Sequence, residues 1–585
     1  MKIIGQSKKY VTGFQDLVIR FPLTISLLLV MTIDSLTTQG FLFGNQTVQL
    51  TLGITALLSA IAELLYERFY NQNKTKRIIL NGIGVIFGLL YYLYLHFSTD
   101  LNSNWPIYSI PGIRSMILFF TLAIVFIWIP SLKSTLTFEE SFLAVFKAFF
   151  ISLFFSVVLY LGIMFTFILF EMLIAPAGDN WYTYSSVLVF NFFWPVFFLY
   201  LIPDYKENKS SSYVFETPKL LSHLVSWILV PVMVLYSAII LLYIFTNLGG
   251  DFFNDSLLEP LLLSYAISGW ILLILSAGID RLIVKGFKRF FPILLLLVIV
   301  FQMIASTIQI GEVGMTHGRY LILLFGLASI ICGVFYILKR QKLELLPLVA
   351  TIAGMIALVP PIDALSLSVS NQVSRLESAL ERNNMLENDE VVKQDSVPKE
   401  DQEEILSSAN YLIEINALDR VSFIPDDFQN SSYSNVYTLF GFDPDDNHYG
   451  YGMNPSWITV SDWNQGKTII PLEDYNQLIP LYLSSDMRRL EVSLNSNQET
   501  YLLEIGKELL IKIENESEEV IGEMDFSYLL DQWDIGEQEE LSLAEATFEE
   551  VGETFKAKII LRELSQYENG EYYSDVYLLI GTIEE

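Results

Sequence analysis

Cysteine is almost absent from this chain of 585 residues, which contains Cys332 alone. A disulfide framework requires paired cysteines, so the sequence excludes one. Histidine is nearly as scarce: there are four, and they form neither an HExxH motif nor a His/Cys cluster that would hold a metal ion. Glycine loops of the GxSxG and Walker types are missing as well. The sequence therefore predicts no cofactor and favours a protein that is not an enzyme.

Positive charge is missing from the last third of the chain. Up to Pro360 the sequence carries 22 Lys and Arg against 18 Asp and Glu, and beyond it 13 against 47. The mean hydropathy of the whole chain is nevertheless +0.44, so apolar residues must be concentrated in the first part. The second part has a net charge of −34, which repels the phosphates of nucleic acids and excludes them as partners. One membrane part and one acidic, water-facing part are predicted.

Long apolar runs dominate the first part. A bilayer core of about 30 Å requires about 20 mostly apolar residues per helix. Asp34 shortens the first such run, and Pro347 interrupts the last. Pro195 and Pro231 each remove one backbone donor and predict kinks in their helices. Eleven windows qualify as spans: 18–36, 47–66, 78–96, 112–130, 142–174, 181–202, 219–247, 255–278, 290–306, 319–338 and 344–360.

Basic residues alternate between the predicted loops. Nineteen Lys and Arg lie in the N-terminal arm and in every second loop, whereas the loops between them hold only Arg114 and Arg319, both at helix starts. Loops rich in Lys and Arg stay in the cytoplasm. The sequence therefore predicts a multi-pass protein of the cell membrane with a cytoplasmic N-terminus. After eleven crossings the C-terminal domain would be extracytoplasmic, and the lipid bilayer is the first predicted partner.

Ionisable residues are rare in the centres of the predicted spans, where a transporter would need them. Glu63, near one end of the second span, is the best candidate for a functional carboxylate. Asn81, Asn191 and His223 are the other polar residues predicted to lie in the membrane interior. Hydrogen bonds between helices explain these three without any further function.

The acidic part begins with helical patterns and ends with strand patterns. Apolar residues at three-to-four spacing predict a helix at 366–386, and a second helix is expected at 402–418. The predicted fold is a polytopic α-helical membrane bundle at 1–360, a helical connector with an acidic hinge at 361–420, and a small α+β or β-rich acidic, water-facing domain at 421–585. Partial alternation of apolar and polar residues predicts strands at 490–494, 501–505, 509–513 and 555–564.

One loop in the acidic part has the spacing of a calcium ligand set. Asp443, Asp445 and Asn447 offer oxygen atoms at positions 1, 3 and 5. Position 6 is His448 rather than Gly, and position 12 is Asn454 rather than Glu. An Asx-rich turn is therefore favoured over a metal site, which stays as the alternative.

Several segments resemble a known family. They look like the corresponding stretches of the bacterial multi-pass membrane family labelled domain of unknown function 4153, and the likeness covers about residues 110–385. The family label carries no activity, so the resemblance implies a bacterial membrane protein and assigns no reaction. The segments are Glu216–Leu221, Phe290–Leu294, Gly314–Leu324, Leu345–Leu348 and the stretch from Pro360 to Gln372.

Three functions compete at this point. The leading hypothesis is a non-enzymatic protein that presents an acidic extracytoplasmic domain for envelope sensing, assembly or interaction. Its partner would be an envelope protein or a cationic ligand. A transporter or permease for a small solute is the alternative, and a cavity lined by Glu63, Asn81, Asn191 or His223 would favour it. A membrane-embedded transferase comes third, because the sequence offers no acid–base pair for it.

Overall fold

The chain divides into two compact units, which are described separately. The helical unit comprises Met1–Asn383 and Glu404–Ile424, and the β unit comprises Asn384–Glu403 and Pro425–Glu585. A computed structural model describes residues 13–37, 46–70, 73–98, 109–174, 180–205, 215–247, 258–339, 342–387, 390–394, 397–425, 439–441, 456–460, 475, 477–484, 488–493, 500–505, 510–514, 520–529, 538–551, 555–566 and 572–582.

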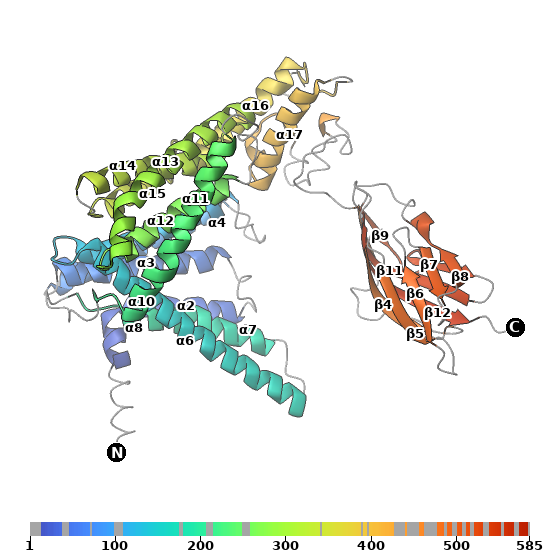
Figure 1. Ribbon diagram of the computed structural model, residues 1–585, viewed down its shortest axis with the longest axis horizontal. Helices are drawn as coiled ribbons and strands as arrows, with labels where there is room; N and C mark the ends of the chain where they lie inside the picture. The colour runs from blue at the N-terminus through green and yellow to red at the C-terminus, as the bar shows by residue number, and fades with distance from the viewer. Residues whose placement is uncertain are drawn as a thin grey trace. The chain divides into compact units, whose positions relative to one another are not determined.

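The helical unit consists of long helices joined by turns (Figure 1). A short helix, Gly13–Arg20, precedes them and meets α2 at an angle of 96°. The others are α2 (Pro22–Thr37), α3 (Gln46–Phe69), α4 (Lys74–Ser98), α5 (Ile110–Trp128), α6 (Phe138–Leu173), α7 (Asn180–Val187), α8 (Trp194–Leu201), α10 (Lys219–Leu224), α11 (Val230–Asn247), α12 (Leu258–Leu275), α13 (Leu282–Val313), α14 (His317–Leu338), α15 (Leu346–Ile356), α16 (Ala364–Arg382) and, from Glu404 on, α17 (Lys399–Glu414).

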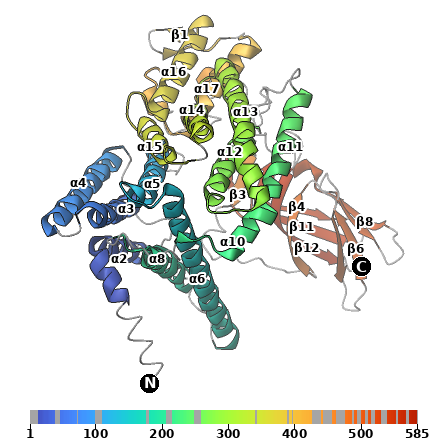
Figure 2. The ribbon, with the colours of Figure 1, turned by 60° about the vertical axis from the view of Figure 1, so that its left-hand side comes forward.

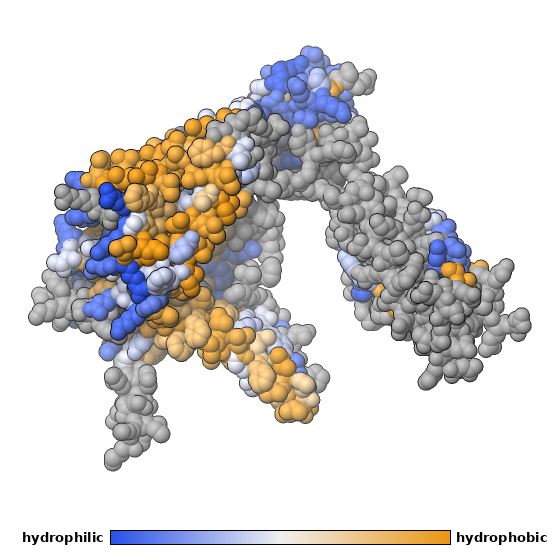
Figure 3. Space-filling view, viewed as in Figure 1, coloured by the Kyte–Doolittle hydropathy of each residue, from blue (hydrophilic) through white to orange (hydrophobic). Residues whose placement is uncertain are grey.

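The composition of these helices is that of a membrane protein. Among the described residues, eight helices are long and apolar enough to cross a bilayer, or nine if the bent pair Gly13–Arg20 and Pro22–Thr37 is one span. Two further apolar helices, Pro260–Leu275 and Leu346–Ile356, are shorter. Each of the eleven predicted windows overlaps one of these helices, but the count of eleven is not confirmed. Hydrophobic side chains cover the visible surface of the long helices in Figure 3, whereas the region of α16 and α17 is hydrophilic.

The helical unit has two distinct ends. We call one the basic end: Arg20, Arg68 and Arg77 lie there, close to the turns at Ile202–Pro203 and Leu132–Lys133. We call the other the connector end, where α16 and the C-terminal part of α17 lie together in both ribbon views (Figures 1 and 2).

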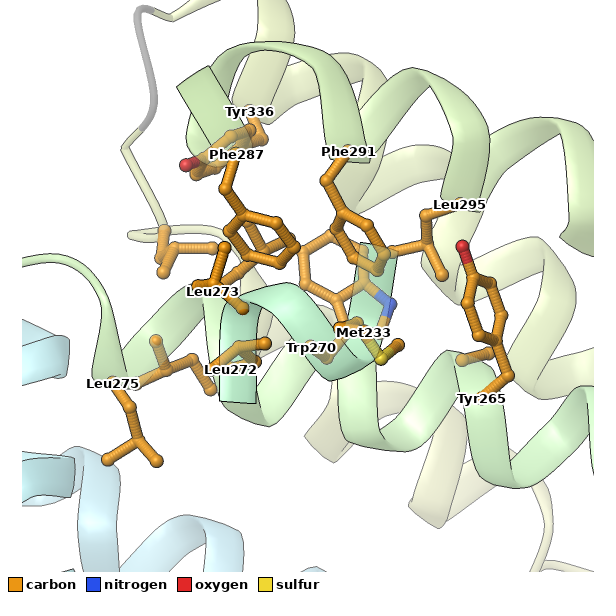
Figure 4. Packing of buried hydrophobic residues seen from close by; sticks show 14 of the residues in the cluster. Met233, Tyr265, Trp270, Leu272, Leu273, Leu275, Phe287, Phe291, Leu295 and Tyr336 are labelled. Carbon is orange, nitrogen blue, oxygen red and sulfur yellow. The ribbon is translucent and has the colours of Figure 1, made fainter. Parts of the chain in front are cut away.

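Helices α11 to α14 enclose a large apolar core. In Figure 4, Phe287 and Phe291 of α13 lie beside Leu273 and Trp270 of α12. The two phenylalanine rings stack with centroids 4.4 Å apart. A Cβ atom on Gly269 would lie 2.7 Å from the Phe291 ring, so the absence of a side chain allows α12 to approach α13 this closely.

Two spans contain a π-helical turn beside a proline. The turn η2 (Leu188–Phe193) precedes Pro195, and the turn η3 (Val225–Leu229) precedes Pro231. The Trp194 amide donates to the carbonyl of Val189, five residues back instead of four. A proline has no N–H and crowds the preceding turn, so a wider turn accommodates it without ending the helix.

The β unit is made of two sheets. The larger sheet has the order β4–β12–β11–β3–β9, with β10 also paired to β11, and the smaller has the order β5–β6–β7–β8. Each of the four predicted strand segments overlaps a strand, and the predicted helices at 366–386 and 402–418 overlap α16 and α17. The strands are β3 (Ser456–Val460), β4 (Gln477–Ser484), β5 (Arg488–Ser493), β6 (Thr500–Ile505), β7 (Leu510–Glu514), β8 (Val520–Asp525), β9 (Gln538–Leu541), β10 (Thr547–Val551), β11 (Phe555–Gln566) and β12 (Tyr572–Thr582), with a short ladder of β1 (Leu386–Glu387) and β2 (Glu390–Val391).

The core of the β unit lies on its two longest strands. Strands β11 and β12 pair antiparallel from Phe555 opposite Thr582 to Gln566 opposite Tyr572. Ile559 and Ile560 of β11 are both buried, although neighbouring side chains of a strand point to opposite faces. Both faces of the larger sheet are therefore covered at this point.

Candidate functional site: a buried charge network

Two carboxylates lie one helical turn apart on α3. Glu63 and Glu67 have four-residue spacing, which places them on one face of the helix. Their relative exposures are 1% and 3%, so both are removed from water and from lipid. Burying an unpaired carboxylate would cost several kcal/mol, so each must have a cationic partner.

An arginine from another helix pairs with each carboxylate. Arg77 of α4 approaches Glu63 at 2.8 Å, and Arg20 approaches Glu67 at 2.7 Å. Arg20 holds both oxygens of Glu67, through Nε at 2.7 Å and Nη2 at 2.9 Å. Such two-point contacts use the planar guanidinium fork, which lysine lacks.

The arginines also bind the main chain of nearby turns. Arg20 donates to the carbonyls of Ile202 and Pro203, each at 2.7 Å. Arg77 donates to the carbonyls of Ile19 at 2.8 Å and of Arg20 at 2.9 Å. These two carbonyls belong to the end of the short first helix, so the network fixes the 96° bend that leads into α2.

Asn81 extends the network across three helices. Its Nδ2 donates to Glu63 at 2.9 Å, and its Oδ1 accepts from the Ser59 hydroxyl at 2.8 Å. The Thr24 hydroxyl of α2 donates to Ser59 Oγ at 3.0 Å. The polar chain therefore links α2, α3 and α4 at the basic end.

A cavity of about 740 Å³ opens beside the network. Glu63, Glu67, Arg20 and Arg77 line it, together with Asp16, Tyr66, Tyr200 and Asp204 among others. Two carboxylates and two guanidinium groups make the buried part of the network neutral. Because each carboxylate is held by an arginine, the arrangement favours structural support over proton transfer by a free base.

The other candidate residues lie elsewhere. Asn191 lies in η2, is 8% exposed, and donates to the Ser35 hydroxyl at 3.0 Å. His223 is exposed at the basic end, where Nδ1 lies 2.7 Å from the Lys219 carbonyl and Nε2 lies 3.0 Å from Arg281 Nη2. The structure thus brings Glu63 and Asn81 together and keeps Asn191 and His223 apart from them.

No metal site can be built from the residues that the structure describes. Asp443, Asp445 and Asn447 lie outside them. Within the described ranges, no group of three or more His, Cys, Asp or Glu side chains is arranged to hold an ion.

A second buried ion pair, which the sequence did not predict, lies at the connector end. Arg114 Nη2 approaches Asp363 Oδ2 at 2.7 Å, and the Asp363 side chain has no exposed surface. Burial raises the pKa of Asp363, but the hydrogen bonds from Ser366 and Arg114 and the charge of Arg114 outweigh it, so the pKa lies below its ordinary value. The only signal in the sequence was the position of Arg114, one of two basic residues in a set of loops that otherwise contains no Lys or Arg.

Comparison with known families gives one match. The family model described as domain of unknown function (DUF4153) matches residues 23–399, which is more than half of the chain and a longer stretch than the resemblance noted in the sequence. Neither a curated protein nor a solved structure matches the chain.

Proposed function

We propose that this chain, which belongs to the family of the domain of unknown function DUF4153, is a multi-pass membrane protein that presents an acidic domain outside the cytoplasm. In this proposal residues 1–360 form the membrane bundle, 361–420 the connector and 421–585 the water-facing domain. The domain serves envelope sensing, assembly or interaction, and its charge suits a cationic ligand or a basic face of an envelope protein.

The observation that carries the proposal is the docking of the connector. The Asp363–Arg114 pair ties the exit from α15 to the start of α5. Tyr411 of α17 accepts a hydrogen bond from the His317 amide at 3.0 Å, and the Ile110 amide donates to the Ile415 carbonyl at 3.3 Å. We would not expect these contacts between the connector and the bundle if the two parts had unrelated functions.

Helix α16 also binds the main chain of the turn between α13 and α14. Asn371 accepts from the Met315 amide at 2.7 Å, and Gln372 donates to the carbonyls of Val313 and Met315 at 3.2 and 3.1 Å. Gly314 has a φ of 81°, and a Cβ there would lie 2.6 Å from Gln372. The turn and α16 therefore fit closely, which supports a fixed orientation of α16 within the helical unit.

The contacts on either side of α15 support eleven crossings. At its start, the Leu343 amide donates to Glu139 at the basic end at 3.3 Å. After its end, Asp363 pairs with Arg114 at the connector end. The chain passes from one end to the other between these residues, although only Leu346–Ile356 is helical. Together with Pro260–Leu275 and the bent first pair, this brings the eight longer spans to eleven.

Orientation follows from charge. The predicted cytoplasmic loops carry the Lys and Arg that meet at the basic end, so this end would face the cytoplasm. An odd number of crossings then puts the connector end, α16 and the acidic domain on the other side of the membrane.

Two matched cysteine variants test the orientation. In a Cys332→Ala background, Ser378→Cys places a thiol on an exposed position of α16, and Thr135→Cys places one in an exposed turn at the basic end. In intact cells, a membrane-impermeant maleimide should label only the cysteine at 378, and permeabilisation should add label at 135. The opposite pattern would overturn the presentation of the domain outside the cytoplasm.

A transporter remains a second candidate because of the cavity of about 740 Å³ at the charge network. Glu63 lines this cavity, as the transporter hypothesis requires. Proteoliposomes with an internal pH dye test it: a transporter coupled to protons should carry a proton flux that Glu63→Gln abolishes. A flux equal to that of empty liposomes would exclude a proton pathway through Glu63.

A further inference from the structure

Two cavities of different character in the helical unit share one lining residue. The first, of about 350 Å³, lies between α5, α12, α14 and α15. The second, of about 520 Å³, lies at the basic end. Ile274 lines both of them. Each volume is within the range of about 300–1,000 Å³ that small-molecule sites occupy.

The first cavity is an apolar slot that runs along the helices. On α15 it extends from Leu346 to Ala357, which is about 16 Å of helix. Ala350 and Ala353 give it width, because their side chains are small. The described residues that line the slot carry no charge, and the indole N–H of Trp270 is taken up by the Ser329 hydroxyl at 3.1 Å.

The second cavity is polar and carries charges of both signs. Glu139, Glu140 and Glu216 line it, and so does Lys288. Glu139 accepts from the Leu343 amide at 3.3 Å, and Glu140 from the Thr137 amide at 2.9 Å. Lys288 donates weakly to the carbonyls of Ala277 and Ile279, at 3.3 and 3.4 Å. Among the described residues, three carboxylates and one ammonium group therefore border this space.

We propose that the two cavities form one site for a zwitterionic aminophospholipid, with an acyl chain in the slot and the head group in the polar cavity. The slot matches an alkyl chain because it is long, narrow and apolar. The polar cavity matches the head group because Lys288 can bind the phosphate, while Glu139 and Glu216 attract the ammonium group.

Charge selects this lipid over an anionic one. Among the described residues that line the polar cavity, three carboxylates stand against the one ammonium group of Lys288. A head group with only a phosphate would pair with Lys288 but would meet the repulsion of the carboxylates. A head group that adds an ammonium ion removes this repulsion, and the acyl slot is open to both lipids equally.

Native mass spectrometry of the purified full-length protein tests the site. Phosphatidylethanolamine and phosphatidylglycerol with the same acyl chains are added in equal amounts in mild detergent. The protein should retain phosphatidylethanolamine at least threefold better. Lys288→Met and Glu139→Gln should each remove most of this preference, whereas Lys285→Met, in an exposed ion pair with Asp280, should keep it. An equal retention of the two lipids, or a preference for phosphatidylglycerol, would refute the head-group assignment.

The slot is tested by filling it. Ala353→Phe should reduce the retention of both lipids at least threefold. Met355 lies two residues away on α15 and is 51% exposed, so Met355→Phe should not reduce it. If Ala353→Phe fails to fold, the slot is tested on the wild-type protein by photocrosslinking with a phospholipid that carries a photoreactive diazirine in its acyl chain. Adducts should map to the four helices that line the slot, α5, α12, α14 and α15. Unchanged retention by the folded variant, or adducts confined to other helices, would overturn the proposal.

Discussion

The two ends of the helical unit are closed by different means. At the basic end, cationic side chains of the spans donate to main-chain carbonyls of turns: Arg20 to Ile202 and Pro203, Arg68 to Leu132, and Lys147 to Glu216. At the connector end, a later segment of the chain closes the turns, because α16 binds the loop between α13 and α14. The first end is built by the spans alone, and the second is complete only once residues 361–424 are present.

This difference shows two uses of the same charges. The Lys and Arg that predict orientation also cap the orphan carbonyls at helix ends. At the basic end, the Lys and Arg that make these hydrogen bonds therefore have a structural role in addition to their role in orientation. The connector end lacks such cations apart from Arg114 and Arg319 among the described residues of the spans, and side chains of the connector take over their task.

The largest expected effect comes from breaking the basic end at Arg20. Arg20→Met removes the guanidinium group that pairs with the buried Glu67 and its hydrogen bonds to the carbonyls of Ile202 and Pro203. Removing one partner of a buried ion pair costs about 3–5 kcal/mol. Unfolding in mixed micelles with increasing dodecyl sulfate should show this loss. A variant as stable as the wild type would mean that the network does not support the fold.

A smaller effect is expected at the connector end from Asp363→Asn. The amide keeps an oxygen for Arg114 but removes the charge, which should cost about 1.5–3 kcal/mol, the range for hydrogen bonds to charged groups. The readout is local: a cysteine introduced at Ser368, a residue with no exposed surface, should react faster with maleimide in this variant. Equal labelling rates with and without the Asp363→Asn substitution would show that the ion pair does not hold the connector.

Acid should act on the connector end through the same carboxylate. Because the pKa of Asp363 is lowered in the folded protein, its contribution is fully present above the unfolded value of about 3.9 and is lost as the pH falls through the folded value. The reactivity of the cysteine introduced at Ser368 should therefore be constant from about pH 8 to about pH 5, after correction for thiolate content. It should rise only below about pH 4. The Asp363→Asn variant should lack this rise, and an equal rise in both proteins would assign it to another group.

The smallest effect is expected from an exposed ion pair at the basic end. Lys285 lies 3.3 Å from Asp280, but the side chains are 61% and 92% exposed. Such pairs contribute little because water screens them. Lys285→Met should leave the unfolding midpoint unchanged under the conditions used for Arg20→Met. A loss as large as that of Arg20→Met would show that burial does not distinguish the two pairs.

The fold could be predicted from the sequence where local pattern decides it. Apolar runs indicated the long helices, and alternation indicated β5, β6, β7 and β11. The family resemblance was confirmed and extends further than the motifs that suggested it. The number of spans was harder, because helices such as Leu346–Ile356 are shorter than the apolar window that contains them.

The candidate site was predictable only in part. The sequence singled out Glu63 and Asn81 because polar groups are costly inside a membrane. Arg77 could also have been predicted as the partner of Glu63. Glu63 precedes Tyr70 by as many residues as Arg77 follows it, and Tyr70 lies in the turn between two antiparallel helices, so the two side chains come to the same level. The pairs Arg20–Glu67 and Arg114–Asp363, 47 and 249 residues apart, depend on packing between distant helices, which no local pattern encodes.

The π turns beside Pro195 and Pro231 determine which mutations the spans that contain them can accommodate. A π turn accommodates one residue more than an α turn, and one residue corresponds to about 100° of rotation. The halves of such a span consequently present faces that are out of phase, so that Asn191 in η2 reaches Ser35 of α2 while the helix beyond Pro195 is rotated toward other neighbours. Substitutions leave this phase intact. Deleting a single residue from η2 would return it to an α turn and crowd Pro195 against the preceding turn, so chain length is constrained here as well as side-chain identity.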